Sequence, residues 1–449
     1  PSIPDETPMT ETTAARTEAT LTQCAEQNGD LFAFAELLPE TALATARYLD
    51  EMQANDVSLG PLHGCQIGVK DIIDVAGVPT RAGSLTRSDQ APAERDAFVV
   101  ARLRGAGAVI AAKTNTVEFA LGGWGTNANI GSPRNPWNRD VPHTCGGSSS
   151  GSGAAVGAGL LPAALGSDTG GSVRIPASLC GCVGLKTSIG LVSRAGVVPL
   201  SDTLDTVGPL THNVRLAAEI LNVIQGEDRA DPTTIDIPHQ DPLAGLERGV
   251  SGLSIAALPL DTLSGVKPGV AAAFAKAKDI LAGLGARIQE TPLPVSLEEY
   301  QARTTKLSAG DSYSFHHLMA DDAACPINDT TRKRMLVARD LTTKDRVTLL
   351  RERAAAIRDF HAHFDRHDAI ILPTTPTTAI PLSEVDEDNY TISLYTRFAN
   401  YLELAGVSVP IDLSPTGLPT SLQIVVRRFD DPLALRIAHA FETARGKLS

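Results

Sequence analysis

Short apolar runs and amphipathic stretches alternate along most of the chain. Runs of about six residues, which have the length of buried strands rather than of helices, occupy 65–70 (CQIGVK), 108–113 (AVIAAK), 162–167 (PAALGS), 253–258 (LSIAAL), 286–290 (ARIQE), 368–373 (DAIILP) and 421–426 (SLQIVV). Helical patterns precede several of them and close the chain: 96–104, 152–160, 269–283 and a last helix from about Asp431-Pro432. This alternation predicts an α/β fold with a sheet covered on its faces.

The domain organisation follows from the ends of these patterns. Residues 1–20 are predicted to form a mobile N-terminal tail, and the first 23 residues lack the apolar stretch of a secretion signal. Residues 21–449 are predicted to form one domain. The stretch 226–252 is rich in Pro, Asp and Gly and is the best linker candidate, but we do not expect it to separate independent domains. A variable, substrate-shaping region is predicted over about 225–340.

Charge and composition restrict the classes of partner that we expect. Lys and Arg number 39 against 52 Asp and Glu, so the formal charge is −13. This argues against a nucleic-acid partner, which would require clustered basic residues. The uncharged stretch 141–167 is rich in Gly and Ser and broken by Pro162, so we expect no membrane span. Six scattered cysteines indicate reduced thiols and a cytoplasmic protein.

No metal or cofactor is predicted. Cys180 and Cys182 are separated by one glycine, which is neither a redox nor a zinc spacing. His361, His363 and His367 fall on one predicted helix, where a solvated face is the simpler interpretation.

Two glycine-rich clusters flank one helix–strand unit and carry the candidate chemistry. They are 146–153 (GGSSSGSG) and 166–177 (GSDTGGSVRIPA). The glycines in D-T-G-G-S allow a tight turn that exposes backbone N–H groups, with Ser172 at its end. A hydroxyl beside several N–H donors is the arrangement that acyl transfer requires.

A serine nucleophile needs a base, and no histidine lies in an informative motif. Lys70 stands at the end of the apolar strand 65–70. Burial disfavours the ammonium form, so a lysine carried inward by a strand can be neutral near pH 7.

These segments together resemble the amidase signature family. The matching blocks are 60–84 (GPLHGCQIGVKDIIDVAGVPTRAGS), 113–123 (KTNTVEFALGG), 146–159 (GGSSSGSGAAVGAG), 166–188 (GSDTGGSVRIPASLCGCVGLKTS), 204–214, 372–377 and 417–442. The resemblance covers roughly residues 25–445 in one order. It implies a single large domain with a mixed, twisted β-sheet covered by helices.

The resemblance also implies a Ser–cisSer–Lys triad. Here its members are Lys70, Ser148 and Ser172. Ser172 is then the nucleophile, and Ser148, beside a cis peptide bond, passes the proton between Ser172 and a neutral Lys70. The pair of Ser148 and Lys70 then returns a proton to the leaving amine.

Further roles follow by the same resemblance. Thr169, Gly170, Gly171 and Ser172 contribute backbone N–H groups to an oxyanion hole, and Ser149 hydrogen-bonds the lysine. Two departures are small: Ser150 stands where the family often has glycine, and Thr187-Ser188 follows the GLK block where proline is common.

The substrate pocket is expected to include Gly122, Gly123 and Trp124. The segment 300–335 carries Tyr313, Phe315, Leu318 and Met319, which either line a hydrophobic entrance or form an ordinary surface helix.

The predicted function is a stand-alone amidase-type hydrolase. It is expected to cleave C–N bonds of neutral, fairly apolar amides or carbamates, of the aryl amide or urethane type, through an acyl-enzyme on Ser172. No Arg or Lys cluster near the signature demands an anionic substrate. A small-molecule substrate is the expected partner, and a homodimer is compatible with the resemblance alone.

Three other interpretations were weighed. The amidase subunit of a tRNA-dependent amidotransferase, which works in a complex and sends ammonia onward, is the alternative within the family; we see no dedicated tRNA-binding extension. The sequence 147–151 (GSSSG) also fits a nucleophile elbow with Ser149 as nucleophile, but no strand precedes it. A non-enzymatic binding subunit is disfavoured because Lys70, Ser148 and Ser172 are all present.

Overall fold

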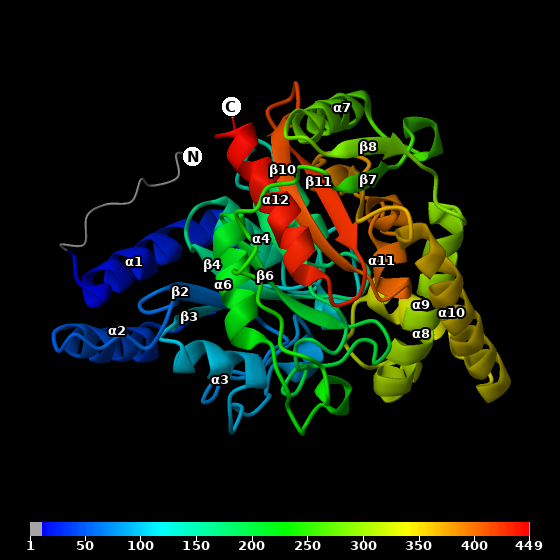
Figure 1. Cartoon of the computed structure of the whole chain (residues 1–449). Helices are drawn as coiled ribbons and strands as arrows, with labels where there is room; N and C mark the ends of the chain where they lie inside the picture. Colours follow the sequence, from blue (N-terminus) through cyan, green and yellow to red (C-terminus); the bar gives the residue numbers. More distant parts are fainter. Residues whose placement is uncertain (1–10, 449) are drawn as a thin grey trace.

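A computed structural model describes residues 11–448, with one 11-stranded sheet at its centre (Figure 1). The strands are β1 (Phe34–Leu37), β2 (Gln66–Lys70), β3 (Val109–Thr114), β4 (Ala163–Asp168), β5 (Val183–Lys186), β6 (Thr206–Thr211), β7 (Ser254–Ala257), β8 (Arg287–Glu290), β9 (Ala369–Pro373), β10 (Ala405–Leu413) and β11 (Pro419–Val426). Their order is β1-β3-β2-β4-β6-β5-β10-β11-β9-β7-β8. Parallel pairs join β2 to β3 and β4, and β7 to β8 and β9, while the other pairs are antiparallel.

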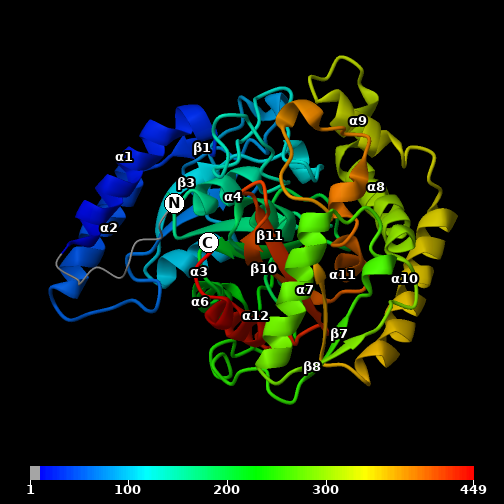
Figure 2. The same ribbon diagram turned by 90° about the horizontal axis from the view of Figure 1, so that it is seen from above.

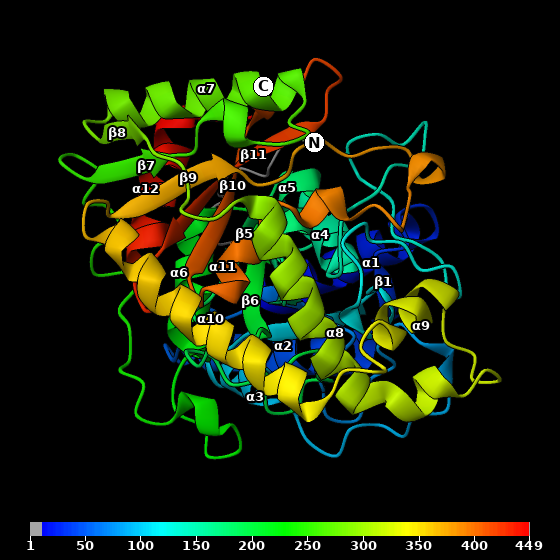
Figure 3. The same ribbon diagram turned by 90° about the vertical axis from the view of Figure 1, so that its right-hand side faces the viewer.

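Helices cover both faces of the sheet. They are α1 (Thr13–Leu31), α2 (Pro39–Gln53), α3 (Phe98–Gly105), α4 (Ser150–Gly157), α5 (Arg174–Cys180), α6 (Val214–Ile224), α7 (Pro268–Gly283), α8 (Leu297–Asp321), α9 (Asp329–Leu336), α10 (Thr343–Phe364), α11 (Arg397–Tyr401) and α12 (Asp431–Arg445). Figure 3 shows the central strands between α4 and α5 on one side and α6 and α12 on the other. The helices α8, α9 and α10 gather at one side of the molecule, far from α1 and α2 (Figures 1 and 2).

The sequence patterns explain the central strands. Every residue of β2, β3, β4, β9 and β11 is buried, which fits continuous apolar runs in strands covered on both faces. The amphipathic α6 begins at Asn213, whose side chain accepts a hydrogen bond from the N–H of Leu216. The predicted α/β class, single domain and mixed sheet are confirmed, as are the strands and helices named above.

The N-terminal prediction is wrong in part. Residues 13–20 form the first turns of α1, where Thr13 and Thr17 are buried, so they are not a tail. A regular helix with a Thr12 cap was hidden by its low apolar content. The rest of that prediction, on 1–10, lies outside the described residues.

Two negative observations apply to residues 11–448. None of the helices there is long and apolar enough to cross a membrane. Within 226–252 the structure has only the short 3₁₀ turn Pro232–Thr234, and the strands before and after it join one sheet.

Candidate active site

The parallel pairing of β2 with β4 places the two glycine-rich clusters next to Lys70. Because both strands run in one direction, their carboxyl ends meet at one edge of the sheet, the usual place for sites in such folds. Lys70 ends β2, and Asp168 ends β4 directly before the D-T-G-G-S turn. The fold therefore assembles segments that lie about one hundred residues apart.

Lys70 is completely buried and binds two hydroxyls. Its Nζ donates to Ser148 Oγ at 2.8 Å and to Ser167 Oγ at 2.9 Å. Burial lowers the pKa of Lys70 to about 7, although the carboxylates of Asp205 and Asp168 raise it. Near neutral pH this lysine is thus poised between its neutral and charged forms, as a proton-transfer group requires.

Ser148 is held rigidly between Lys70 and the backbone. The Gly147–Ser148 peptide bond is cis, as the resemblance implied. The Ser148 carbonyl accepts hydrogen bonds from the N–H of Val117 and from Thr116 Oγ1 at 3.1 and 3.0 Å. Its side chain, buried completely, therefore faces the lysine with little freedom to turn away.

Ser149 does not bind the lysine as expected. Its Oγ lies 3.3 Å from the N–H of Ser167 and 3.4 Å from the Ser167 carbonyl oxygen. The hydroxyl of Ser167 holds the second position at Lys70 instead. Ser167 belongs to β4, so its side chain could be assigned to the lysine only once the pairing of β2 with β4 was known.

The D-T-G-G-S turn is ordered by the Asp168 carboxylate. Its oxygens accept the N–H of Gly171 at 2.7 Å and that of Val173 at 3.2 Å. Gly171 therefore cannot donate to an oxyanion in this conformation, contrary to the prediction. Among the described residues, the N–H groups of Thr169, Gly170 and Ser172 make no hydrogen bond, which leaves three of the four expected donors.

A buried ion pair fixes the carboxylate itself. Arg174 donates to both oxygens of Asp168 at 2.9 Å, and both side chains are fully buried. Burial alone would raise the pKa of Asp168, but Arg174 and then Lys186 hold it well below its usual range. The carboxylate is therefore ionised near neutral pH and accepts the N–H groups of the turn in that form.

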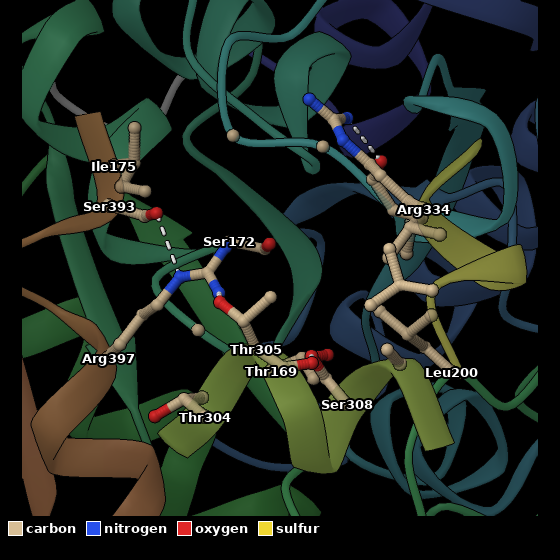
Figure 4. Close-up of a pocket in the computed structure, with 17 residues that line it drawn as sticks. Thr169, Ser172, Ile175, Leu200, Thr304, Thr305, Ser308, Arg334, Ser393 and Arg397 are labelled. Carbon is tan, nitrogen blue, oxygen red and sulfur yellow. Dashed lines mark hydrogen bonds between the residues drawn. The ribbon is translucent and has the colours of Figure 1, made fainter. Parts of the chain in front are cut away.

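A cavity of about 680 Å³, open to solvent, lies beside Ser172 (Figure 4). One side, which we call the catalytic wall, is formed by residues of the signature segments: Gly122, Gly123, Thr169, Gly170, Ser172 and Ile175. The opposite side, the substrate wall, comes from α8, α9 and α11: Thr304, Thr305, Ser308, Ala309, Arg334 and Arg397.

The expected pocket residues are distributed differently from the prediction. Gly122 and Gly123 do line the cavity. Trp124 does not: it packs in an apolar cluster with Ile175 and Leu179, and its Nε1 donates to the Asn389 carbonyl at 2.9 Å. The indole is drawn away from the cavity because that carbonyl satisfies its N–H in a buried place.

The segment 300–335 does border the cavity, but through other residues. Its lining comes from the polar side of α8 near Thr304 and Ser308 and from Arg334. Phe315 and Leu318 lie on the exposed side of α8 instead, with Leu318 78% exposed. Of the two alternatives for residues 313–319, the structure therefore favours an ordinary surface helix over a hydrophobic entrance.

Two arginines in the cavity went unnoticed in the sequence. Arg334 donates to Glu387 Oε2 at 2.6 Å and to the Leu121 carbonyl at 2.8 Å. Arg397 donates to Ser393 Oγ at 2.9 Å and to Thr305 Oγ1 at 2.6 Å. Neither lies in a signature block, and only the fold brings them together.

Comparison with known proteins identifies the surrounding family. The family model described as Amidase matches residues 15–435. A protein of Anaeromyxobacter sp. (strain K), named as a subunit of glutamyl-tRNA(Gln) amidotransferase, is 37% identical and aligns with 96% of this chain and 92% of its own length.

Two solved structures show the same architecture. One is described as a vestigial protein complex that reveals the evolutionary origins of an s-triazine catabolic enzyme; it is 29% identical with a TM-score of 0.91, covering 98% of this chain and 96% of its own. The other is the corresponding glutamyl-tRNA(Gln) amidotransferase subunit from Thermotoga maritima, 30% identical with a TM-score of 0.76, with the same coverage.

These relatives correct the functional prediction. The curated relatives are named as subunits of an amidotransferase, at 34–37% identity over most of the chain. The expectation of a stand-alone hydrolase for neutral, apolar amides or carbamates, without a nucleic-acid partner, is therefore wrong.

Proposed function

This chain belongs to the amidase signature family, and from that premise we propose that it is the amidase subunit of a tRNA-dependent amidotransferase-like complex. The observation that carries the proposal is the 37% identity that extends over 92% of a relative named as an amidotransferase subunit. The hydrogen bond from Lys70 to Ser148 and the position of Ser172 beside the cavity support it, because an amide-cleaving relay needs a base, a proton carrier and an accessible nucleophile. In this role the chain hydrolyses a carboxamide and supplies ammonia to the rest of the complex.

The reaction begins with proton transfer away from Ser172. Neutral Lys70 takes the proton of Ser148 along their 2.8 Å hydrogen bond, and Ser148 takes that of Ser172. Among the described residues no hydrogen bond joins Ser148 and Ser172, so the proposed relay requires this contact to form in the complex with substrate. Ser172 Oγ then bonds to the amide carbon, and the oxyanion receives the N–H groups of Gly170 and Ser172.

The second half of the reaction returns the proton to the leaving nitrogen of the amide and then hydrolyses the acyl-enzyme. The ammonium of Lys70 protonates the leaving nitrogen through Ser148, the C–N bond breaks, and ammonia departs. Water then attacks the acyl-enzyme, gives its proton to the same relay and releases the acid and free Ser172. Each cycle converts one amide and one water into one acid and one ammonia, and Lys70 ends it neutral.

The first test measures ammonia release from primary amides, including glutamine, by the chain alone and co-expressed with its amidotransferase partners. Ser172→Ala is expected to abolish the release, by at least about 10⁴-fold. Ser150→Ala is the matched control: Ser150 is the first residue of α4, two positions after Ser148, and its buried Oγ has no partner among the described residues. Full activity in Ser172→Ala, or a chain that never co-purifies with the partners, would contradict the proposal.

Labelling with a fluorophosphonate identifies the nucleophile independently. Ser172→Ala is expected to remove the label, whereas Ser149→Ala retains it on Ser172. Label that persists in Ser172→Ala and disappears in Ser149→Ala would instead favour the nucleophile elbow.

A second candidate rests on the structural comparison. The TM-score is 0.91 for the complex linked with an s-triazine catabolic enzyme and 0.76 for the amidotransferase subunit from Thermotoga maritima. This favours a catabolic amidase that also works inside a protein complex but releases ammonia without tRNA. Ammonia release that is unchanged by glutamyl-tRNA and its partners would favour this candidate over the first.

A further inference from the structure

Arg397 occupies the cavity directly beside the nucleophile turn. Figure 4 shows its guanidinium between Ser172 and Thr305, within the cavity. The side chain also packs on the turn: a Cβ built on Gly170 would stand 3.4 Å from Arg397 Cγ and 3.7 Å from Nε. A group bonded to Ser172 therefore has a positive charge close by.

Neutral hydroxyls orient this charge, and the cavity lining as a whole is positive. Arg397 donates to the hydroxyls of Ser393 and Thr305. Arg334, the other arginine of the lining, forms an ion pair with Glu387 at 2.6 Å. The described residues that line the cavity include both arginines and no aspartate or glutamate. The lining therefore attracts anions and offers no carboxylate to an ammonium group.

Arg397 is also held at a fixed place relative to Ser172. Its neighbours on α11 are bound by the ion pair below the turn: Arg174 donates to the Thr396 carbonyl at 3.0 Å and to Asn400 Oδ1 at 2.6 Å. A rigidly placed guanidinium selects both the charge and the reach of a ligand, because its N–H groups match a carboxylate in a fixed fork geometry.

We propose that Arg397 binds a carboxylate on the acyl part of the substrate, so that the site selects primary amides of dicarboxylic acids that lack an α-amino group. Glutaramate, which is glutamine without its amino group, represents this class. The inference rests on the proposed amidase function and names the substrate of that same site. It replaces the expectation of a neutral, apolar substrate, which considered only the signature segments.

The test compares kcat/KM for ammonia release from glutaramate, its neutral analogue valeramide, and glutamine. The full chain is expected to prefer glutaramate over valeramide by about 10- to 100-fold, the range for a hydrogen bond to a charged group, and to prefer it over glutamine. Arg397→Gln is expected to bring the glutaramate-to-valeramide ratio close to one, mainly through KM. Arg397→Lys restores part of it, since the charge remains without the fork.

Arg358→Gln is the matched control, because Arg358 is 72% exposed on α10 and outside the cavity. It removes the same charge and is expected to keep the ratio of the unchanged chain. A ratio near one in the unchanged chain, or an Arg397→Gln chain that loses both substrates equally, would overturn the inference. The proposed function would survive that result as long as Ser172-dependent ammonia release persists.

A binding measurement tests the role of Arg397 without requiring any reaction at Ser172. Calorimetry on Ser172→Ala is expected to detect glutarate but not valeramide, and the double variant with Arg397→Gln is expected to lose the glutarate signal. Equal binding of glutarate with and without Arg397 would overturn the inference, even if none of the three amides is hydrolysed. Absence of hydrolysis with intact glutarate binding would count against the proposed function alone.

Discussion

The two walls of the cavity are built in different ways. The catalytic wall comes from strand ends and turns that lie close together, and the polar side chains behind it are completely buried: Lys70, Ser148 and Arg174 have no exposed surface. The substrate wall comes from α8 and α9, which also carry exposed residues, and from the mostly buried α11, and each helix contributes one or more residues. Chemistry therefore rests on backbone geometry, whereas recognition rests on single side chains.

One buried arginine joins the two walls. Arg174 binds Asp168 on the catalytic side and Thr396 and Asn400 on the side of α11, and it also donates to Gln423 Oε1 at 2.6 Å. The same contacts that shape the nucleophile turn thus position the helix that carries Arg397.

Breaking this link is expected to have the largest effect on stability. Arg174→Met leaves the Asp168 carboxylate buried without its partner, which costs about 3–5 kcal/mol in comparable buried pairs. The free energy of unfolding, measured by urea denaturation, reports the loss.

A more exposed ion pair on α8, the helix that forms part of the substrate wall, provides the comparison for the buried Arg174 pair. Arg303→Gln removes the i,i+4 ion pair with Glu299 on α8, for which about 0.3–0.5 kcal/mol is expected. Similar losses for Arg174→Met and Arg303→Gln would show that the walls do not differ in the way described.

This difference also explains what the sequence could predict. The chemistry beside the catalytic wall lies in contiguous motifs, so Ser172 and Lys70 could be proposed from residue types, and the resemblance to the family added Ser148. Most of the central strands were equally clear because fully buried strands are continuous apolar runs. Arg334 and Arg397 stand in segments without any motif.

The direction of individual side chains is the second feature that the sequence could not predict. Trp124 was expected in the pocket because it follows Gly122 and Gly123, but its indole N–H is bound to the Asn389 carbonyl. For Phe315 the sequence left a pocket entrance and a surface helix open, and the face of α8 on which it lies decides for the latter. Gly171 was assigned to the oxyanion hole because it lies in the turn, whereas its N–H is bound to Asp168. Neither direction can be derived from spacing alone.

Alanine substitutions at the adjacent Gly170 and Gly171 test the contact between the nucleophile turn and the segment that carries Thr396 and Arg397. Gly171 has φ +126°, and a Cβ there would overlap Thr396 Oγ1. Gly170→Ala instead meets Arg397 Cγ at an ordinary 3.4 Å. We expect Gly171→Ala to lower kcat by about 10²–10³-fold, because the shifted turn would displace the neighbouring oxyanion donors of Gly170 and Ser172, and Gly170→Ala to lower it by about tenfold or less. Equal losses in both variants would show that the contact between Gly171 and α11 does not position the turn.

The smallest effect concerns proton transfer on the catalytic wall alone. Neutral Lys70 is the active form and burial lowers its pKa to about 7, so kcat/KM is expected to fall about tenfold for each pH unit below 7 and to level off above it. Asp205 raises the pKa of Lys70, and its carboxylate is hydrogen-bonded by the N–H groups of Leu200 and Ser201. Removing that negative charge with Asp205→Asn is expected to move the acid limb to lower pH, because the ammonium form loses a favourable interaction. Arg397→Gln removes a charge from the opposite wall and should change KM while leaving the limb in place. If the acid limb of the pH profile shifted in Arg397→Gln but not in Asp205→Asn, the charge on the substrate wall would control the protonation of Lys70. Chemistry and recognition would then not be separate functions of the two walls.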